Sequence, residues 1–185
     1  MSAPARIRTL YEYVEGLPEG YTGEIVRGQL HVNPRPAGPH IRVGSKLGSR
    51  IETRFDEGEG GPGGWWILGE PELHFVRDVE IAVPDIAGWR REHMPTFPDD
   101  QRFEIVPDWV CEILSPRTAE FDRGEKANTY LHYGVAFYWI VDPKARTVEA
   151  LAARDGAWRD VGSCSGDSPI RLPPFDAVAL PPPWS

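Results

Sequence analysis

Two acidic residues stand inside short apolar stretches of this sequence, where their chemistry points to a metal site. Asp85 lies within residues 83–87, and Glu112 interrupts the apolar run of residues 109–114. An unpartnered carboxylate inside a strand is costly, so each acid must be paired, protonated or bound to a metal. If the two strands are neighbours, the carboxylates can converge on one divalent cation. Mg²⁺ needs only one or two carboxylates beside water and phosphate oxygens, so two acids suffice.

Two further residues could complete such a site. The carbonyl group of Ile113 is a candidate additional ligand. A bound metal would polarise a phosphoryl oxygen and lower the pKa of an attacking water, and Lys126 could orient that water or stabilise charge on phosphorus. A simpler interpretation remains open, because buried acids are often only hydrogen-bonded. Lys126 would then be an exposed helical residue paired with Asp122, four positions earlier.

The elements that must position these residues occupy the middle of the chain. Residues 109–114 are typical of a buried strand. Thr118 can cap a following helix, and Gly134 lies where a helix normally stops. Residues 137–141 form a second strongly apolar strand. A strand, helix and strand of this length make a crossover unit, which predicts at least one parallel pair in the sheet.

The rest of the chain predicts further strands and one clear helix. We expect a short helix before Pro18, a hairpin at residues 24–32, a helix at residues 40–55, paired strands at residues 65–68 and 72–76, a strand at residues 83–87, and a hairpin joining residues 147–152 to 158–161. Residues 90–107 read as an irregular surface excursion. The proline-rich end from Leu172 is expected to lie on the surface.

The helix predicted at residues 40–55 carries two different faces. Its apolar stripe is formed by Ile41, Leu47, Ile51 and Phe55. Its basic ridge, with one residue every four positions, is formed by Arg42, Lys46, Arg50 and Arg54. The ridge is either a solvated helix face or a surface that contacts nucleic-acid phosphates.

Length and composition favour a single globular domain over residues 1–185. The net charge is -8, and residues 56–115 hold 14 acids against 4 bases. This balance counts against tight nonspecific binding of nucleic acid without a divalent metal. Cys111 and Cys164 show no ligand spacing and suit a reducing cytoplasm. Since no run approaches the roughly 18 apolar residues of a membrane span, we expect a soluble cytoplasmic protein without a membrane partner.

Several motifs together resemble the PD-(D/E)XK nuclease superfamily. They are Pro84-Asp85, Glu112 in a strand ending Glu-Ile-Leu-Ser-Pro, the series Asp122, Lys126 and Tyr130, and residues 138–143. Within the superfamily, the chain is most similar to a large branch of bacterial restriction-endonuclease-like proteins. The resemblance covers most of the chain and extends to the hairpin at residues 24–30 and to His40.

The resemblance implies both a fold and an activity. The implied fold is an α/β restriction-endonuclease-like core, a mixed sheet of four or five strands flanked by helices. The predicted N-terminal and C-terminal hairpins would be additions to that core. The implied activity is hydrolysis of DNA with Mg²⁺ or Mn²⁺, with Asp85 and Glu112 as the metal-binding acids. The superfamily pattern places a lysine two residues after the second acid. That position is Leu114 here, so Lys126 on the following helix becomes the candidate.

The accessory residues and the rival functions stay open at this point. Glu24, His40, Asp122 and Tyr130 are accessory candidates, each with a structural alternative as a paired acid, surface residue, early-helix acid or packing residue. The chain could instead be a non-catalytic binding or assembly module that keeps the fold. RNA or a repair intermediate could replace DNA as substrate, and two copies could form a homodimer.

Overall fold

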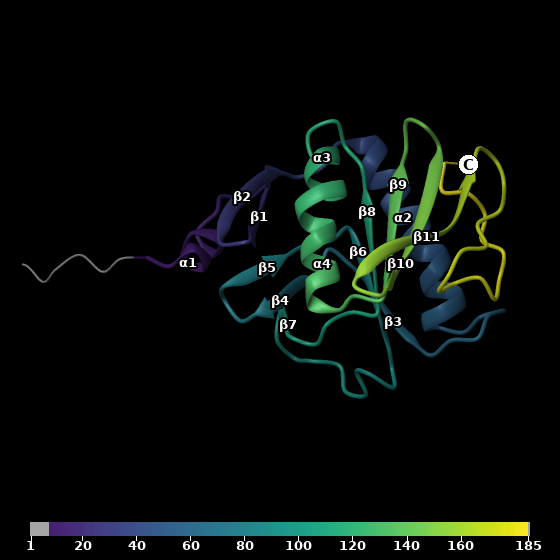
Figure 1. Cartoon of the computed structure of the whole chain (residues 1–185), viewed down its shortest axis with the longest axis horizontal. Helices are drawn as coiled ribbons and strands as arrows, with labels where there is room; N and C mark the ends of the chain where they lie inside the picture. The colour runs from purple at the N-terminus through teal and green to yellow at the C-terminus, as the bar shows by residue number, and fades with distance from the viewer. Residues whose placement is uncertain (1–7, 185) are drawn as a thin grey trace, which may run out of the picture.

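The computed structural model describes residues 8–184, and its strands form two mixed sheets (Figure 1). The larger sheet has the order β11-β10-β9-β8-β6-β3, and the smaller sheet has the order β2-β1-β5-β4-β7. The strands of the larger sheet are β3 (Trp65–Gly69), β6 (Ile86–Arg90), β8 (Trp109–Ile113), β9 (Phe137–Asp142), β10 (Thr147–Arg154) and β11 (Ala157–Ser165). Those of the smaller sheet are β1 (Tyr21–Val26), β2 (Gln29–Pro34), β4 (Glu72–Val76), β5 (Glu80–Ala82) and β7 (Arg102–Phe103).

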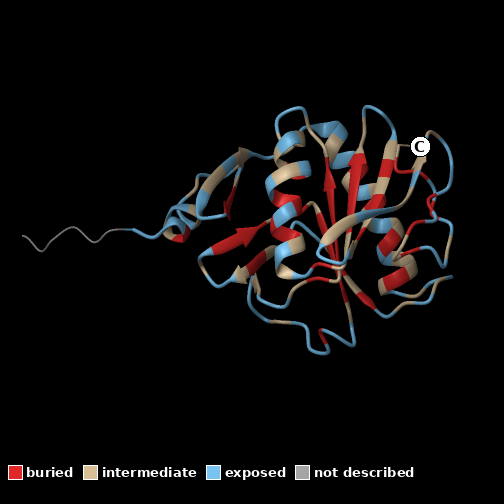
Figure 2. Ribbon diagram, in the orientation of Figure 1, coloured by how far each residue is buried: buried red, intermediate tan, exposed pale blue. Residues whose placement is uncertain are grey.

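Helices cover both faces of the larger sheet. The chain forms α1 (Leu10–Glu15), α2 (Gly38–Ile51) with the π-helical turn η1 (Glu52–Asp56), and a continuous helical segment of α3 (Ala119–Phe121), η2 (Asp122–Lys126) and α4 (Ala127–Tyr133). Side chains alternate along a strand, so Cys111 and Ile113 pack towards α2 while Val110 packs towards α4. The buried residues of Figure 2 concentrate in these central strands.

The predicted crossover unit is confirmed. Strands β8 and β9 are parallel, with Trp109 opposite Phe137 and Ile113 opposite Val141. Gly134 ends α4 with a φ of 88°, a left-handed conformation that glycine adopts without steric cost. Thr118 occupies the N-cap position, but its side chain makes no capping hydrogen bond. The Ser115 hydroxyl instead accepts the Thr118 N–H at 3.2 Å, so the expected cap is wrong.

The predicted mixed sheet with terminal hairpins is confirmed, although the larger sheet has six strands. The C-terminal hairpin β10–β11 extends it, whereas the N-terminal hairpin β1–β2 belongs to the smaller sheet. The predicted pairing of residues 65–68 with residues 72–76 is wrong, because β3 pairs with β6 and β4 pairs with β5. Between them Glu70 has a positive φ of 50°, and the chain turns there from one sheet to the other.

Three sequence expectations need local corrections. The strand expected at residues 83–87 begins only at Ile86, because Pro84 and Asp85 form the passage from β5 into β6. The stripe of α2 uses Val43 in place of Ile41, whose exposed fraction is 51%. The excursion at residues 90–107 is not wholly irregular, since it contains β7, which pairs in parallel with β4.

The C-terminal segment was expected on the surface, and this expectation is wrong. Phe175 is fully buried, with its ring 4.8 Å from that of Trp109 and 4.9 Å from that of Trp65. The indole N–H of Trp139 donates a hydrogen bond to the Pro173 carbonyl at 2.7 Å. The many prolines hide the apolar spacing, because they prevent the periodic elements by which a buried segment is recognised. None of the helices in the described part of the chain is long and apolar enough to cross a membrane.

Candidate active site

Asp85 and Glu112 lie on neighbouring chain segments, as the predicted site requires. Strand β6 runs antiparallel to β8, with Ile86 opposite Cys111, so Asp85 just before β6 lies beside the end of β8. The Ile113 N–H donates a hydrogen bond of 2.6 Å to Asp85 Oδ2. This bond fastens the Asp85 carboxylate to the strand that carries Glu112.

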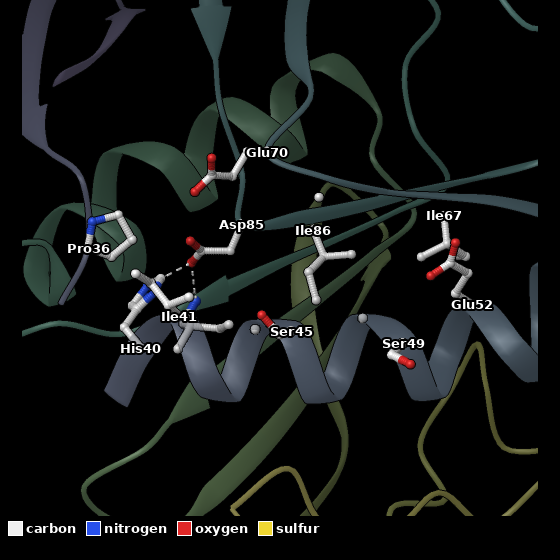
Figure 3. Close-up of a pocket in the computed structure, with 14 residues that line it drawn as sticks. Pro36, His40, Ile41, Ser45, Ser49, Glu52, Ile67, Glu70, Asp85 and Ile86 are labelled. Atoms are coloured by element: carbon white, nitrogen blue, oxygen red, sulfur yellow. Dashed lines mark hydrogen bonds and ion pairs between the residues drawn. The ribbon is translucent and has the colours of Figure 1, made fainter. Parts of the chain in front are cut away.

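His40 reaches Asp85 from the first turn of α2. Its Nε2 lies 3.3 Å from Asp85 Oδ2, and Figure 3 shows the imidazole turned towards this carboxylate. Burial alone would lower the pKa of His40, but the hydrogen bond and charge of Asp85, with the backbone of Ile113, raise the pKa above its ordinary value. His40 is therefore a hydrogen-bonding partner that orients Asp85, rather than a surface residue.

Lys126 is buried, with an exposed fraction of 3%, and it joins the two sheets. Its Nζ lies 2.7 Å from Glu112 Oε1 and 2.8 Å from Glu24 Oε1, and it donates to the Val83 carbonyl at 3.3 Å. The alternative of an exposed Lys126 paired with Asp122 is wrong. The residues from Asp122 to Lys126 form a π-helical turn, where regular four-residue spacing does not hold.

Glu24 holds this lysine from the smaller sheet. It occupies the fourth position of β1 rather than the strand start, and its exposed fraction is 5%. Its Oε1 also accepts the Val83 N–H at 2.8 Å, so it ties β1 to the segment that leads into Asp85. Glu24 was identified as a candidate only through the resemblance, because nothing local in its sequence distinguishes it.

The charges around Glu112 oppose one another. Burial raises the pKa of Glu112 well above its usual range, the Lys126 ammonium lowers it, and the nearby carboxylates raise it. The Tyr130 hydroxyl donates a hydrogen bond of 2.6 Å to Glu112 Oε1, so this tyrosine holds Glu112 as well as packing in the core. For Lys126, burial lowers the pKa, but the charges of Glu112 and Glu24 dominate and raise it.

Asp122 is another buried carboxylate of the same cluster. Burial raises its pKa to about 6, against the opposing effect of the Lys126 charge. Asp122 does lie early in the helical segment, as expected, but it is only 4% exposed and faces the site cavity.

The acids and the lysine open onto one cavity of about 350 Å³. The predicted residues that line it are Glu24, His40, Asp85, Glu112, Ile113, Asp122 and Lys126. A second cavity of about 390 Å³ runs along α2 and shares His40, Asp85 and Ile113 with the first (Figure 3). Tyr130 lies behind Glu112 and lines neither cavity.

The basic ridge of α2 does not contribute to this site. None of its four residues, all within the described chain, lines either cavity: Arg42, Lys46, Arg50 and Arg54. The Arg50 guanidinium donates to the Pro181 carbonyl at 3.2 Å and to that of Pro182, and Arg54 donates to the Glu59 carbonyl at 2.5 Å. Two of the four bases therefore hold the fold together.

The donor chemistry fits a hard divalent cation. Within residues 8–184, the carboxylate contacts of Asp85 all involve Oδ2 and those of Glu112 all involve Oε1, so each carboxylate keeps one oxygen for a ligand. The described residues do not bring three or more His, Cys, Asp or Glu together as a metal cage. Mg²⁺ needs no such cage, because it keeps several waters and binds through one or two carboxylates.

Sequence reasoning missed three charged residues of the cavity wall. Arg35 and Glu70 form an ion pair of 3.0 Å there, and Arg117 lies in the loop after β8. Of these three, only Arg117 could have been found from the sequence. It follows the carboxyl end of a predicted parallel strand, where ligand sites of α/β sheets occur. The ion pair joins a loop after β2 to the turn after β3, and no local pattern connects those two segments.

Comparison with known proteins agrees with the fold and identifies the family. Residues 10–182 match the Uma2 family, described as "Putative restriction endonuclease". A crystal structure of a putative nuclease belonging to DUF820 from Anabaena variabilis ATCC 29413 shares this fold, with a TM-score of 0.73 and 23% sequence identity over 96% of this chain and 97% of that chain. No curated protein matches the chain. Because the family match spans nearly every residue, the chain belongs to the Uma2 family, a restriction-endonuclease-like branch of the PD-(D/E)XK proteins.

Proposed function

We propose that this protein is a metal-dependent endonuclease that hydrolyses phosphodiester bonds of DNA. The observation that carries the proposal is the 2.7 Å contact between Lys126 Nζ and Glu112 Oε1 inside a cavity that also contains Asp85. In this proposal, Lys126 from the helix takes the role of the lysine that is missing at position 114. An acid, a second acid and a lysine converge, which is the set that the family's chemistry requires.

Asp85 and Glu112 would hold the cation, Mg²⁺ or Mn²⁺, through their remaining oxygens, and the Ile113 carbonyl is a further candidate ligand. When bound, such a cation polarises a phosphoryl oxygen and lowers the pKa of an attacking water. His40 orients Asp85, and Tyr130 orients Glu112, so both carboxylates are fixed before substrate arrives. Fixed ligands avoid reorganisation during the reaction.

Lys126 acts as a cation in this proposal rather than as a base. Its pKa is raised by Glu112 and Glu24, so it stays protonated at neutral pH. A buried ammonium near the phosphate stabilises the negative charge that develops when water attacks, because the low local dielectric strengthens the attraction. The same ammonium can donate a hydrogen bond to the water and hold it in line.

Conservative substitutions test the assignment of the acids. Asp85→Asn and Glu112→Gln should each lower nicking of a supercoiled plasmid by at least about 100-fold, since even residues that only support a metal ligand cost about 10- to 100-fold. Calorimetric titration of Mg²⁺ and Mn²⁺ into metal-free protein should show weaker binding for both variants. Glu57→Gln, an exposed acid outside both cavities, is the matched control.

The role of Lys126 is tested by a substitution that removes its charge. Lys126→Met should abolish nicking while metal still binds, and Lys144→Met, at an exposed lysine, should nick as well as wild type. Circular dichroism must accompany the assay, because an unpaired buried carboxylate costs about 3–5 kcal/mol of stability. Full nicking by Lys126→Met would contradict the assigned role. Absence of both metal binding and nicking in wild type would favour the non-catalytic binding module, and cleavage of RNA alone would change the substrate.

A further inference from the structure

A groove adjoins the active-site cavity on its side towards β2. It has a volume of about 670 Å³, within the range of small-molecule pockets, and we call it the His31 groove. One wall comes from β2 and the other from the start of the α3–η2 helical segment. The groove and the active-site cavity share Asn33, Arg117 and Thr118, so the two form one continuous surface.

The His31 groove has an aromatic wall. The rings of His31 and Phe121 are stacked, with centroids 4.3 Å apart and planes inclined by 28°. Leu30 and Val32 add aliphatic surface, and Val32 is 41% exposed. Planar rings beside aliphatic side chains are the surfaces on which unpaired nucleobases stack in proteins that bind single strands.

One polar atom in this wall lacks a partner. His31 Nε2 is buried and makes no hydrogen bond within residues 8–184. A buried polar atom without a partner is costly, and imidazole nitrogen pairs well with the edge of a base. The unsatisfied atom therefore favours a ligand that brings both a flat apolar face and hydrogen-bonding groups.

The charged residues of the groove favour binding of one nucleotide rather than of several consecutive phosphates. Arg117, at the junction with the active-site cavity, is exposed and makes no ion pair or hydrogen bond within the described chain. Its guanidinium is placed to bind a phosphate between the two cavities. Glu120 and Glu125 also line the groove, where they disfavour a second phosphate and can accept hydrogen bonds from amino groups of a base.

We propose that the His31 groove holds one unpaired nucleotide of the strand that is cut, next to the scissile phosphate. The base stacks in the groove, and Arg117 binds the phosphate at the junction. This inference rests on the proposed nuclease function and specifies its substrate class as single strands or duplexes with an unpaired base at the cut. A paired base in a regular duplex would have to be extruded first, which weakens binding.

Gly124 offers a way to fill the groove without disturbing the fold. It lines the groove, and a Cβ added at this glycine would meet no heavy atom within 4 Å. The position is helical, so leucine is a better helix former there than glycine. Gly124→Leu therefore blocks the groove, and Asn128→Leu, an exposed position on the same helical segment outside it, is the matched control.

The test measures binding of fluorescent 12-nucleotide strands by anisotropy, with Ca²⁺ in place of Mg²⁺ and Mn²⁺ so that a hard divalent cation is present. Gly124→Leu should weaken binding of an ordinary single strand about 5- to 150-fold, which corresponds to loss of one stacked base. It should leave unchanged the binding of a 12-nucleotide strand made only of abasic sites. Arg117→Gln should weaken both strands, because it removes a phosphate contact, and Asn128→Leu should weaken neither.

The outcomes separate this inference from the nuclease proposal. If Gly124→Leu binds the ordinary strand as tightly as wild type, the groove holds no base and the inference is overturned, whatever the plasmid assay shows. The inference is also overturned if Gly124→Leu weakens both strands equally. If Gly124→Leu weakens only the ordinary strand while wild type cuts nothing with Mg²⁺ or Mn²⁺, the groove stands as a single-strand site and the nuclease proposal fails.

Discussion

Each face of the larger sheet holds an apolar cluster, but the face under the α3–η2–α4 segment also buries an ion pair. We call this the charged face, and the face under α2 the apolar face. On the face under α2, the ring of Phe175 lies 4.8 Å from that of Trp109 and 5.6 Å from that of Trp139. On the face under the α3–η2–α4 segment, Glu112 and Lys126 are buried as an ion pair. The alternation of side chains along β8 and β9 separates the two environments.

Burial of the apolar rings stabilises the folded state, whereas burial of the charges destabilises it. Large rings removed from water contribute about 25 cal/mol for each Å² of apolar surface buried. Charges removed from water cost several kcal/mol each, and their pairing offsets only part of that cost. The apolar face therefore supports the charged face, and each should respond differently to substitution.

The largest expected effect is a loss of stability from a substitution in the apolar face alone. Phe175→Ala should lower the free energy of unfolding by about 3–5 kcal/mol, because it leaves a cavity among fully buried rings. Urea denaturation measures this loss. Calorimetric Mg²⁺ affinity should be unchanged at temperatures where the variant is folded, since Phe175 is outside both site cavities. Phe97→Ala, at a ring 39% exposed, is a control with a smaller loss. A matching fall in metal affinity would show that the two faces are not separable.

The next effect is a pH dependence that belongs to the charged face. The pKa of Asp122 rises from about 3.8 unfolded to about 6 folded, so the folded protein binds more protons between these values. Stability from this group is therefore lost as pH rises from about 4 to about 6, by roughly 3 kcal/mol at 1.36 kcal/mol per pKa unit. Asp122→Asn removes this loss.

The measurement compares urea denaturation of metal-free wild type and Asp122→Asn from pH 4 to pH 7. The difference in stability should move in favour of Asp122→Asn as pH rises through this window. Asp160→Asn, at an exposed acid on β11, should show no such trend. A difference that stays constant with pH would mean that Asp122 titrates alike in the folded and unfolded chain.

A smaller effect distinguishes the packing role of Tyr130 from its role in orienting Glu112. Tyr130→Phe keeps the buried ring but removes the hydroxyl that donates to Glu112 Oε1. We expect a loss of about 1–3 kcal/mol in stability and a decrease of about 10- to 100-fold in metal affinity, because Glu112 loses a group that orients it. Tyr133→Phe, on the same helix and partly exposed, should change neither quantity. Unchanged metal affinity in Tyr130→Phe would assign Tyr130 to packing alone.

Local sequence patterns predicted the central strand–helix–strand unit correctly, but they did not predict which other strands pair. The β8–helix–β9 crossover was predicted correctly because its apolar runs, its glycine stop and its length are all short-range features. The pairing of β3 with β4 was predicted wrongly, since adjacency in sequence does not reveal that the chain changes sheets near Glu70. The burial of the C-terminal segment was missed because proline obscures periodicity.

The sequence by itself determined which residues are candidates for chemistry and which elements bear them: acids among apolar residues, a lysine on the following helix, and a parallel crossover. These are consequences of residue type and short-range periodicity. Only the tertiary structure decided that Lys126 is buried between Glu24 and Glu112, and that His40 meets Asp85. Such contacts join segments from different sheets and helices, and they depend on how the two sheets meet. The positions of charges in this site are therefore set by packing over long distances in sequence, while their identities are set locally.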